Sequence, residues 1–161
     1  PASICLICEI AAWAKDNGRT LYDLLMDIYV DYGFSKEFTV NVVKPGKTGA
    51  DAIKQMMADF RSNPPKELGG SKIVLWKDYQ TLEATDENGN VTKLDMPTTS
   101  NVLQWFCNDG TKVSVRPSGT EPKIKFYIEV KDNTMKCAGC YDSCCKAGEE
   151  KIEAIKKSLN L

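Results

Sequence analysis

The fold is easiest to see in residues 112–130, which run KVSVRPSGTEPKIKFYIEV. From Lys123 onward, apolar and polar side chains alternate with the two-residue period of a strand that has one buried face. The apolar members of that run are Ile124, Phe126, Ile128 and Val130. Prolines at 117 and 122, with a glycine between them, interrupt the pattern. The stretch therefore predicts two strands, over 112–116 and 123–130, joined by a loop.

More strands are expected upstream of this pair. β-branched and aromatic residues favour strands over 38–43, 73–76, 80–85, 91–94 and 102–107. Asn88-Gly89 and Asp109-Gly110 each separate two such runs, as in tight β-hairpins. Helical spacing of apolar residues predicts helices over 48–63, where Thr48 with Asp51 is expected to cap the start, and over 134–159. This order predicts an α+β fold: an antiparallel sheet with helices packed on one face.

The first 33 residues differ from the rest because they carry only helical patterns. We expect a helix over 3–16 and a second one after Thr20, with Asp23 completing a capping box and Gly33 ending the helix. The chain starts at Pro1 without a methionine, and this hairpin is too small to enclose a core. We therefore expect residues 1–36 to be the helical remnant of a preceding domain, and residues 37–161 to be a C-terminal domain.

Composition narrows the function classes. The formal net charge is -1, so a broad surface for nucleic acid or for an acidic membrane is not expected, and any bound anion requires a local cluster of donors. The sequence contains no histidine, which removes Ser-His-Asp catalysis and the commonest metal ligand. No secretory signal or membrane span is evident. Seven cysteines, an odd number, suit reduced thiols in a cytoplasmic protein.

The loop at residues 116–122, RPSGTEP, is the strongest candidate for a ligand-binding site. Arg116 offers a planar fork that suits phosphate oxygens, and Ser118 and Thr120 add hydroxyl donors. Gly119 lets the backbone turn sharply and approach a ligand, and Lys125 adds charge from the next strand. Two alternatives stay open: a solvated hairpin loop without a ligand, and a nucleophilic Ser118, which lacks an evident base.

The run from Arg116 to Lys125, RPSGTEPKIK, resembles the phosphate-binding loop of the α-D-phosphohexomutases, the phosphoglucomutase/phosphomannomutase family. Residues 6–33 resemble the helices that end the third domain of that family, and residues from about 37 resemble its fourth domain. The resemblance implies the family's C-terminal fold, which is similar to that of the TATA-box-binding protein. It also implies that Arg116, Ser118, Gly119, Thr120 and Lys125 grip a substrate phosphate.

In that family a phosphoserine, assisted by Mg²⁺, exchanges a phosphoryl group with a hexose phosphate through a bisphosphate intermediate. The phosphoserine, metal and sugar-reading loops have no counterpart in this sequence, so the chain is expected to be inactive alone and to hold no cofactor itself. The implied partners are a phosphosugar, whose sugar stays open, and the remaining domains of a parent enzyme. The alternative is a non-enzymatic, regulatory phospholigand-binding module.

A zinc site is one hypothesis for the cysteines near the C-terminus, at positions 137, 140, 144 and 145. On a continuous helix they point in different directions, since each residue turns by about 100°. We therefore expect them to spread around the helix without converging, and an exposed redox-sensitive thiol is a better interpretation than zinc.

Overall fold

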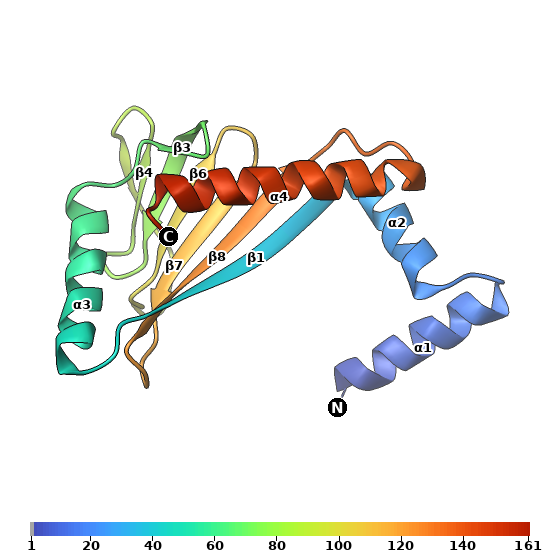
Figure 1. Cartoon of the computed structure of the whole chain (residues 1–161), viewed down its shortest axis with the longest axis horizontal. Helices are drawn as coiled ribbons and strands as arrows, with labels where there is room; N and C mark the ends of the chain where they lie inside the picture. The colour runs from blue at the N-terminus through green and yellow to red at the C-terminus, as the bar shows by residue number, and fades with distance from the viewer. Residues whose placement is uncertain (1) are drawn as a thin grey trace. The chain divides into compact units, whose positions relative to one another are not determined.

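The computed structural model describes residues 2–161, apart from the side chain of residue 47. It contains α-helices, one short 3-10 helix and a β-sheet (Figure 1). The helices are α1 (Ala2–Asp16), α2 (Leu21–Tyr32), α3 (Lys47–Ser62), η1 (Ala138–Cys140) and α4 (Tyr141–Ser158). The strands are β1 (Phe34–Val43), β2 (Glu67–Leu68), β3 (Ser71–Asp78), β4 (Glu83–Asp86), β5 (Val91–Lys93), β6 (Leu103–Cys107), β7 (Lys112–Pro117) and β8 (Lys123–Asp132).

The strands form one sheet in the order β1-β8-β7-β6-β3-β4-β5, and β2 pairs with β3. The pairings from β8 across to β5 are antiparallel. The predicted Asn88-Gly89 hairpin joins β4 to β5, and the Asp109-Gly110 hairpin joins β6 to β7. Gly89 and Gly110 both have positive φ, which hairpin turns of this kind require. The α+β class with an antiparallel sheet is therefore confirmed.

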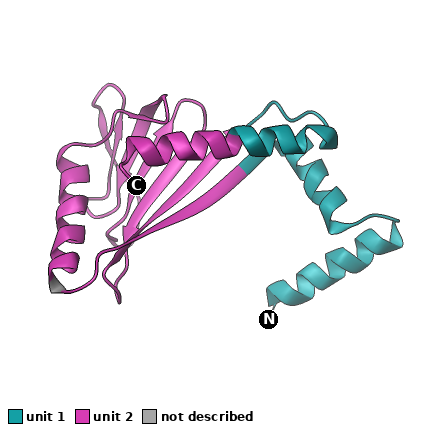
Figure 2. Cartoon of the chain, in the orientation of Figure 1, with its two compact units in different colours: residues 1–35, 132–147 teal, residues 36–131, 148–161 magenta. Residues whose placement is uncertain are grey.

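By its internal contacts the chain divides into two compact units (Figure 2). Unit 1 comprises the residues up to Ser35 together with Asp132–Ala147, and unit 2 comprises Lys36–Lys131 together with Gly148–Leu161. The first break in the chain lies close to the predicted boundary at 36/37, but residues 132–147 also belong to unit 1. The assignment of residues 1–36 to a preceding domain remains a prediction.

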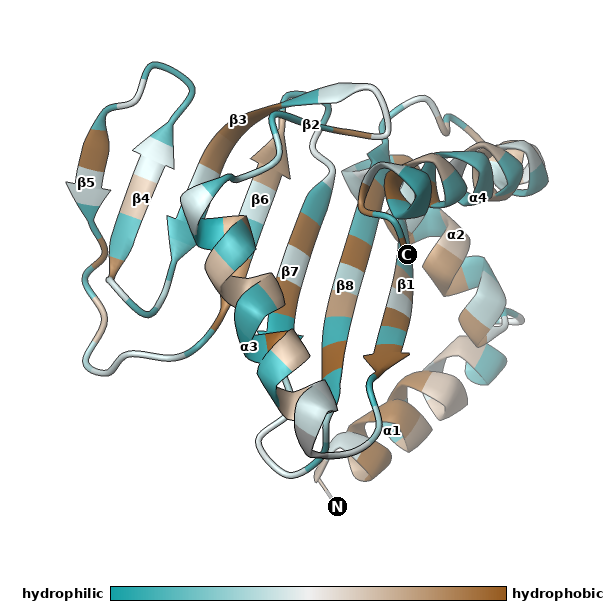
Figure 3. Cartoon of the chain, turned by 60° about the vertical axis from the view of Figure 1, so that its left-hand side comes forward, coloured by the Kyte–Doolittle hydropathy of each residue, from teal (hydrophilic) through white to brown (hydrophobic). Residues whose placement is uncertain are grey.

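The core of unit 2 lies between the sheet and its helices. Figure 3 shows hydrophobic bands alternating with polar ones along β7 and β8, with α3 lying over the sheet. The predicted alternation along β8 is confirmed, since Ile124, Phe126, Ile128 and Val130 are buried. They share a cluster with Trp105 of β6, with Ile53 and Met57 of α3, and with Ile152 and Ile155 of α4. Both helices therefore cover the same face of the sheet.

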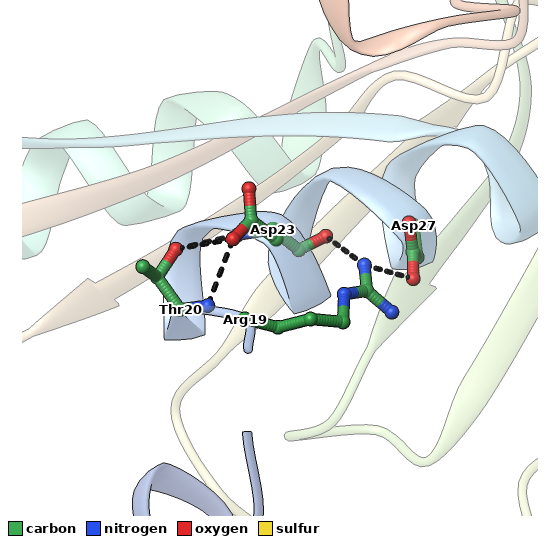
Figure 4. A network of polar contacts seen from close by, with 4 residues as sticks. All are labelled: Arg19, Thr20, Asp23 and Asp27. Carbon is green, nitrogen blue, oxygen red and sulfur yellow. Dashed lines mark hydrogen bonds and ion pairs between the residues drawn. The ribbon is translucent and has the colours of Figure 1, made fainter. Parts of the chain in front are cut away.

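Unit 1 has one small apolar cluster. Its buried members are Met26, Phe34, Met135 and Cys144, and aromatic rings of Tyr29 and Tyr141 pack around them. The predicted capping box of α2 is present: the Thr20 hydroxyl accepts a hydrogen bond from the Asp23 amide, and the Asp23 carboxylate accepts one from the Thr20 amide (Figure 4). Arg19 adds an ion pair with Asp27, one turn further along the helix.

Two local predictions are wrong. Thr48 does not cap α3, because the helix already begins at residue 47; Gly46 is the N-cap, and it makes no side-chain capping bond. The C-terminal helix does not start near residue 134. Residues 133–137 are irregular, and a 3-10 turn at Ala138–Cys140 precedes α4. The helical spacing of apolar residues identified both helices but could not locate where they begin.

Candidate functional site

The loop singled out by the sequence forms the tip of the β7–β8 hairpin. Pro117 still pairs with Ile124 in the ladder, so the free part of the loop is short. Two backbone hydrogen bonds close it: the Ser118 amide donates to the Lys123 carbonyl at 2.8 Å, and the Lys123 amide donates to the Glu121 carbonyl at 2.8 Å. The Lys44 amide, just after β1, donates to the Pro122 carbonyl at 2.9 Å. The loop is therefore anchored on both sides by neighbouring strands.

A groove of about 560 Å³ lies beside this loop. One wall is the loop itself, from Pro117 to Pro122. The other residues that line it are Gly46, Ala50, Ile53, Lys54 and Asn101. Three of the five predicted site residues, Ser118, Gly119 and Thr120, line this one groove. The groove has the volume of a small-molecule pocket.

The first turn of α3 also lines the groove, through Gly46 and Ala50. The first amide groups of a helix lack the usual partner inside the helix, and the helix dipole gives that end a partial positive charge. In α3 one of these amides is engaged, since the Gly49 amide donates to the Gly46 carbonyl at 3.1 Å. Because Gly46 provides no side-chain cap, no side chain at the N-cap position competes for these amides. Lys54, one turn further along, is 81% exposed and makes a long contact of 3.6 Å with Asp51. The arrangement favours an anion.

The backbone at Gly119 differs from that of the other turn glycines. Its φ is outside the positive range occupied by the turn glycines of this chain, so the loop does not need glycine for its backbone angle. A Cβ placed on Gly119 would meet nothing within 4 Å. Among the described residues, the space beside Gly119 is therefore open, and this leaves room for a ligand to approach the backbone.

Arg116 and Lys125 lie apart from the residues that line the groove. They are direct cross-strand partners on β7 and β8, and their strand neighbours Val115, Ile124 and Phe126 are buried. By the alternation of a strand, both side chains therefore point to the face opposite the core. The pair is therefore a local concentration of positive charge next to the loop. Like charges directly opposite each other destabilise a sheet, so a bound anion would relieve this repulsion.

Glu121 is the acidic residue of the loop, and it makes an ion pair with Lys123. The hydrogen bond and charge of Lys123, with the more distant charge of Lys125, hold the pKa of the Glu121 carboxyl below its ordinary value. The Glu121 carboxylate therefore stays ionised and keeps the Lys123 ammonium in an ion pair. The Lys123 ammonium is consequently less available to an anion than the loop hydroxyls are.

Asn101 is a groove residue that the sequence did not indicate. Its carbonyl oxygen accepts a hydrogen bond of 2.7 Å from Arg61. The same Arg61 guanidinium donates to buried Asp78 at 2.8 Å, which fixes it between the two partners. Because the Asn101 oxygen is engaged, its amide nitrogen remains as the donor on the other side. A single asparagine in a loop carries no sequence pattern, and only the fold brings it to the groove.

A metal site has no support in the described part of the chain. No group of three or more histidine, cysteine, aspartate or glutamate side chains converges there to hold an ion. Among the described helices, none is sufficiently long and apolar to cross a membrane.

The architecture is that of an antiparallel α+β domain with a polar loop and a helix start facing one groove. The family model described as "Phosphoglucomutase/phosphomannomutase, C-terminal domain" matches residues 40–136, which is more than half of the chain. The chain therefore belongs to the phosphoglucomutase/phosphomannomutase family, in the part that covers its C-terminal domain.

Individual relatives agree with this assignment. A phosphoglucomutase of Staphylococcus aureus strain MRSA252 is 38% identical over 127 residues, and one of Staphylococcus epidermidis is 36% identical over 126 residues. Each match covers 78% of this chain and 23% of the relative, so the chain spans less than a quarter of the length of these proteins. A solved structure of the Paramecium phosphoglucomutase parafusin matches 86% of this chain and 23% of its own, with 16% identity and a TM-score of 0.41.

Proposed function

We propose that this chain is the substrate-phosphate-binding part of a phosphoglucomutase or phosphomannomutase. The supporting observation is the groove in which Ser118, Gly119 and Thr120 face the start of α3. In the parent enzyme this domain would hold the phosphate that is not being transferred. The reaction would interconvert hexose 1-phosphate and 6-phosphate through a phosphoserine and a bisphosphate intermediate. The domain's contribution is positioning, on which phosphoryl transfer depends strongly.

The proposed grip has two parts on either side of the loop. On the groove side, the Ser118 and Thr120 hydroxyls and the Asn101 amide are neutral donors, and the start of α3 adds the partial positive charge of its dipole. On the other side, Arg116 and Lys125 supply two positive charges whose mutual repulsion a phosphate dianion would relieve. Because the loop is short, a phosphate at its tip is within the reach of a long arginine side chain. The proposal includes all five residues: Arg116, Ser118, Gly119, Thr120 and Lys125.

Catalysis by the isolated chain is not part of the proposal. The phosphoserine and Mg²⁺ of the reaction are expected in other domains of the parent enzyme. The substrate sugar is also left open, since a groove that holds a phosphate selects weakly among glucose, mannose, glucosamine and pentose. A cytoplasmic location, which the reduced thiols suggest, belongs to the same proposal.

Steady-state kinetics of the full-length enzyme that contains this sequence test the proposal. The Arg116→Ala and Ser118→Ala variants remove a charged and a neutral donor. We expect kcat/KM for glucose 1-phosphate to fall by roughly 10- to 150-fold for Arg116→Ala, since a hydrogen bond to a charged group contributes about 1.5–3 kcal/mol. For Ser118→Ala a smaller decrease is expected.

Lys93→Ala is the matched control, because it also removes one exposed positive charge from unit 2. Lys93 lies on β5, which β6, β3 and β4 separate from β7. Unchanged kinetics for Arg116→Ala, or an equal loss for Lys93→Ala, would contradict the proposed grip. An enzyme with no mutase activity that still binds phosphosugars through this loop would favour the regulatory module instead.

A further inference from the structure

Two cysteine sulfurs meet at the start of the last helix. The Sγ atoms of Cys137 and Cys140 lie 3.0 Å apart. Cys137 is exposed and Cys140 is half-buried, and both are free thiols. This corrects the expectation that the cysteines of this segment point in different directions. Cys137 is not helical, since its backbone angles are extended, with φ −157° and ψ 160°. The 3-10 turn that follows brings the Cys140 sulfur close to the Cys137 sulfur.

The chain contains a second pair with the same spacing, and it behaves differently. Cys5 and Cys8 both lie inside α1 and are exposed. Side chains three residues apart on an α-helix have Cβ atoms about 5–6 Å apart, whereas a disulfide requires about 3.5–4.5 Å. No sulfur contact joins Cys5 to Cys8 in the part of the chain that the structure describes. The helix therefore keeps this pair open, while the extended N-cap allows Cys137 and Cys140 to approach.

We propose that Cys137 and Cys140 form a reversible dithiol–disulfide site, which low-molecular-weight disulfides oxidise. The Cys140 thiolate attacks one sulfur of the external disulfide, forms a mixed disulfide and releases one thiolate. The Cys137 thiolate then attacks the Cys140 sulfur, closes the intramolecular bridge and releases the second thiolate. The two cysteine thiols lose two electrons and two protons, and the external disulfide is reduced to two thiols. This site is independent of the phosphate groove.

Cys140 is the attacking thiol of the pair. A hydrogen bond from the Cys137 thiol and backbone hydrogen bonds at residues 136 and 137 lower the pKa of Cys140. Its position directly before α4, an 18-residue helix, adds the favourable end of the helix dipole. Its neighbour Cys144 is buried, and burial together with the Asp132 carboxylate raises the pKa of the Cys144 thiol. Cys144 is therefore a poor competitor for the external disulfide.

Oxidation would affect the packing of unit 1 directly. Cys140 packs against the cluster that contains Met26, Phe34 and Met135. A bridge to Cys137 would fix the turn that leads into α4. The contact between this turn and α2 lies in the same unit, so the amides of α2 are expected to report the change.

The test is alkylation after equilibration of the 161-residue chain in glutathione buffers of increasing oxidised fraction. The chain is then unfolded, its remaining thiols are alkylated, and the products are counted by mass spectrometry. We expect the number of alkylated cysteines to fall from seven to five, because one bridge uses two thiols. Peptide mapping should place the bridge between Cys137 and Cys140, and dithiothreitol should restore all seven thiols.

Two single variants separate this site from general oxidation. Cys140→Ser should keep all six remaining thiols reduced in the same buffer, whereas the matched Cys5→Ser variant should still lose two of its six. The proposal is overturned if the wild-type chain keeps seven thiols in excess oxidised glutathione. It is equally overturned if the bridge maps to Cys5–Cys8 or to Cys144–Cys145.

Discussion

The two compact units differ in how much apolar surface they bury. Unit 2 encloses a core in which Leu103, Trp105, Val113 and Phe126 are fully buried. In unit 1 the helices carry many apolar residues, yet most stay exposed. The large apolar side chains of α1 and α2 that remain exposed include Ile4, Leu6, Ile7, Trp13, Leu21, Ile28 and Tyr32.

Apolar side chains therefore have two different environments in this chain: most are buried in unit 2, and many are exposed on the helices of unit 1. In unit 2 the sheet supplies a wide face that two helices can cover, so alternation in sequence becomes burial. In unit 1 a helical pair and a turn have no sheet face of their own to cover. Unit 1 therefore depends on the capping box of α2 and on the packing of Tyr141 against aromatic rings of α2.

Two tryptophans, one in each unit, should differ most in their contribution to the free energy of unfolding. Trp105 is fully buried and packs edge-on against Phe60, whereas Trp13 is 56% exposed. Trp105→Ala should lower the free energy of unfolding by about 3–5 kcal/mol, a large share of a typical domain's stability. Trp13→Ala should change it by less than about 0.5 kcal/mol. Urea unfolding followed by far-UV circular dichroism measures both, and equal effects would contradict the contrast.

A third variant sharpens this test. The indole N–H of Trp105 is buried and has no hydrogen-bond partner among the described residues. Trp105→Phe removes that unsatisfied donor and keeps most of the ring. We expect it to remain within about 1.5 kcal/mol of wild type, because loss of ring volume and relief of the buried donor offset each other.

The next effect concerns a charged cluster in unit 2. Asp109 accepts hydrogen bonds from the Ser71 hydroxyl and the Thr111 amide, and it lies 3.1 Å from the Lys151 ammonium. Burial pushes the pKa of Asp109 upward, but these bonds outweigh burial and lower the pKa to about 2 from an ordinary value of 3.8. Asp109→Asn should cost about 1 kcal/mol at pH 7, after allowance for solvent screening of a partly exposed group.

The pH dependence of this effect follows from the sign of the shift. Because the folded-state pKa is lower than the unfolded one, the stabilisation is fully present above pH 3.8 and is lost as pH falls through about 2. The difference between wild type and Asp109→Asn should therefore shrink between pH 4 and pH 2. A difference that stays constant over this range, measured by urea unfolding at each pH, would show that the carboxylate charge is not responsible.

The smallest effect is confined to unit 1. Thr20→Ala removes the capping hydroxyl that accepts from the Asp23 amide. Amides of α2 should exchange with solvent about fivefold faster, since this is the size of effect that a lost N-cap typically has. Amides of β7 and β8 should be unaffected. Faster exchange throughout both units would indicate that they unfold together, and would contradict separate stabilisation of unit 1.

Much of the fold was predictable because its signals are local. Three of these signals depend on residues that are neighbours in sequence: the alternation along residues 123–130, the two Asx-Gly hairpins and the Thr20–Asp23 capping box. The start of α3 was not predicted correctly. Thr48 and Asp51 have the three-residue spacing of a capping box, but the helix begins before Thr48. The short strand β2 was also missed, since two residues carry no period.

The candidate site was predictable only in part. The loop is contiguous, so its residue types and order identified it. The opposite wall of the groove comes from α3 and from Asn101, far away in sequence, and only the folded chain brings them to the loop. The contact between Cys137 and Cys140 was missed because a continuous helix was assumed where the structure has an extended residue and a 3-10 turn.

We propose that a phosphate binds at the loop of unit 2 without any contribution from unit 1. A ¹⁵N NMR titration of this chain with glucose 6-phosphate, with Arg116→Ala as the paired variant, tests it most directly. We expect saturable shifts in residues 116–125 and at the start of α3, unchanged signals in α1 and α2, and loss of the response in the variant. Shifts centred on unit 1, or an undiminished response in Arg116→Ala, would contradict it.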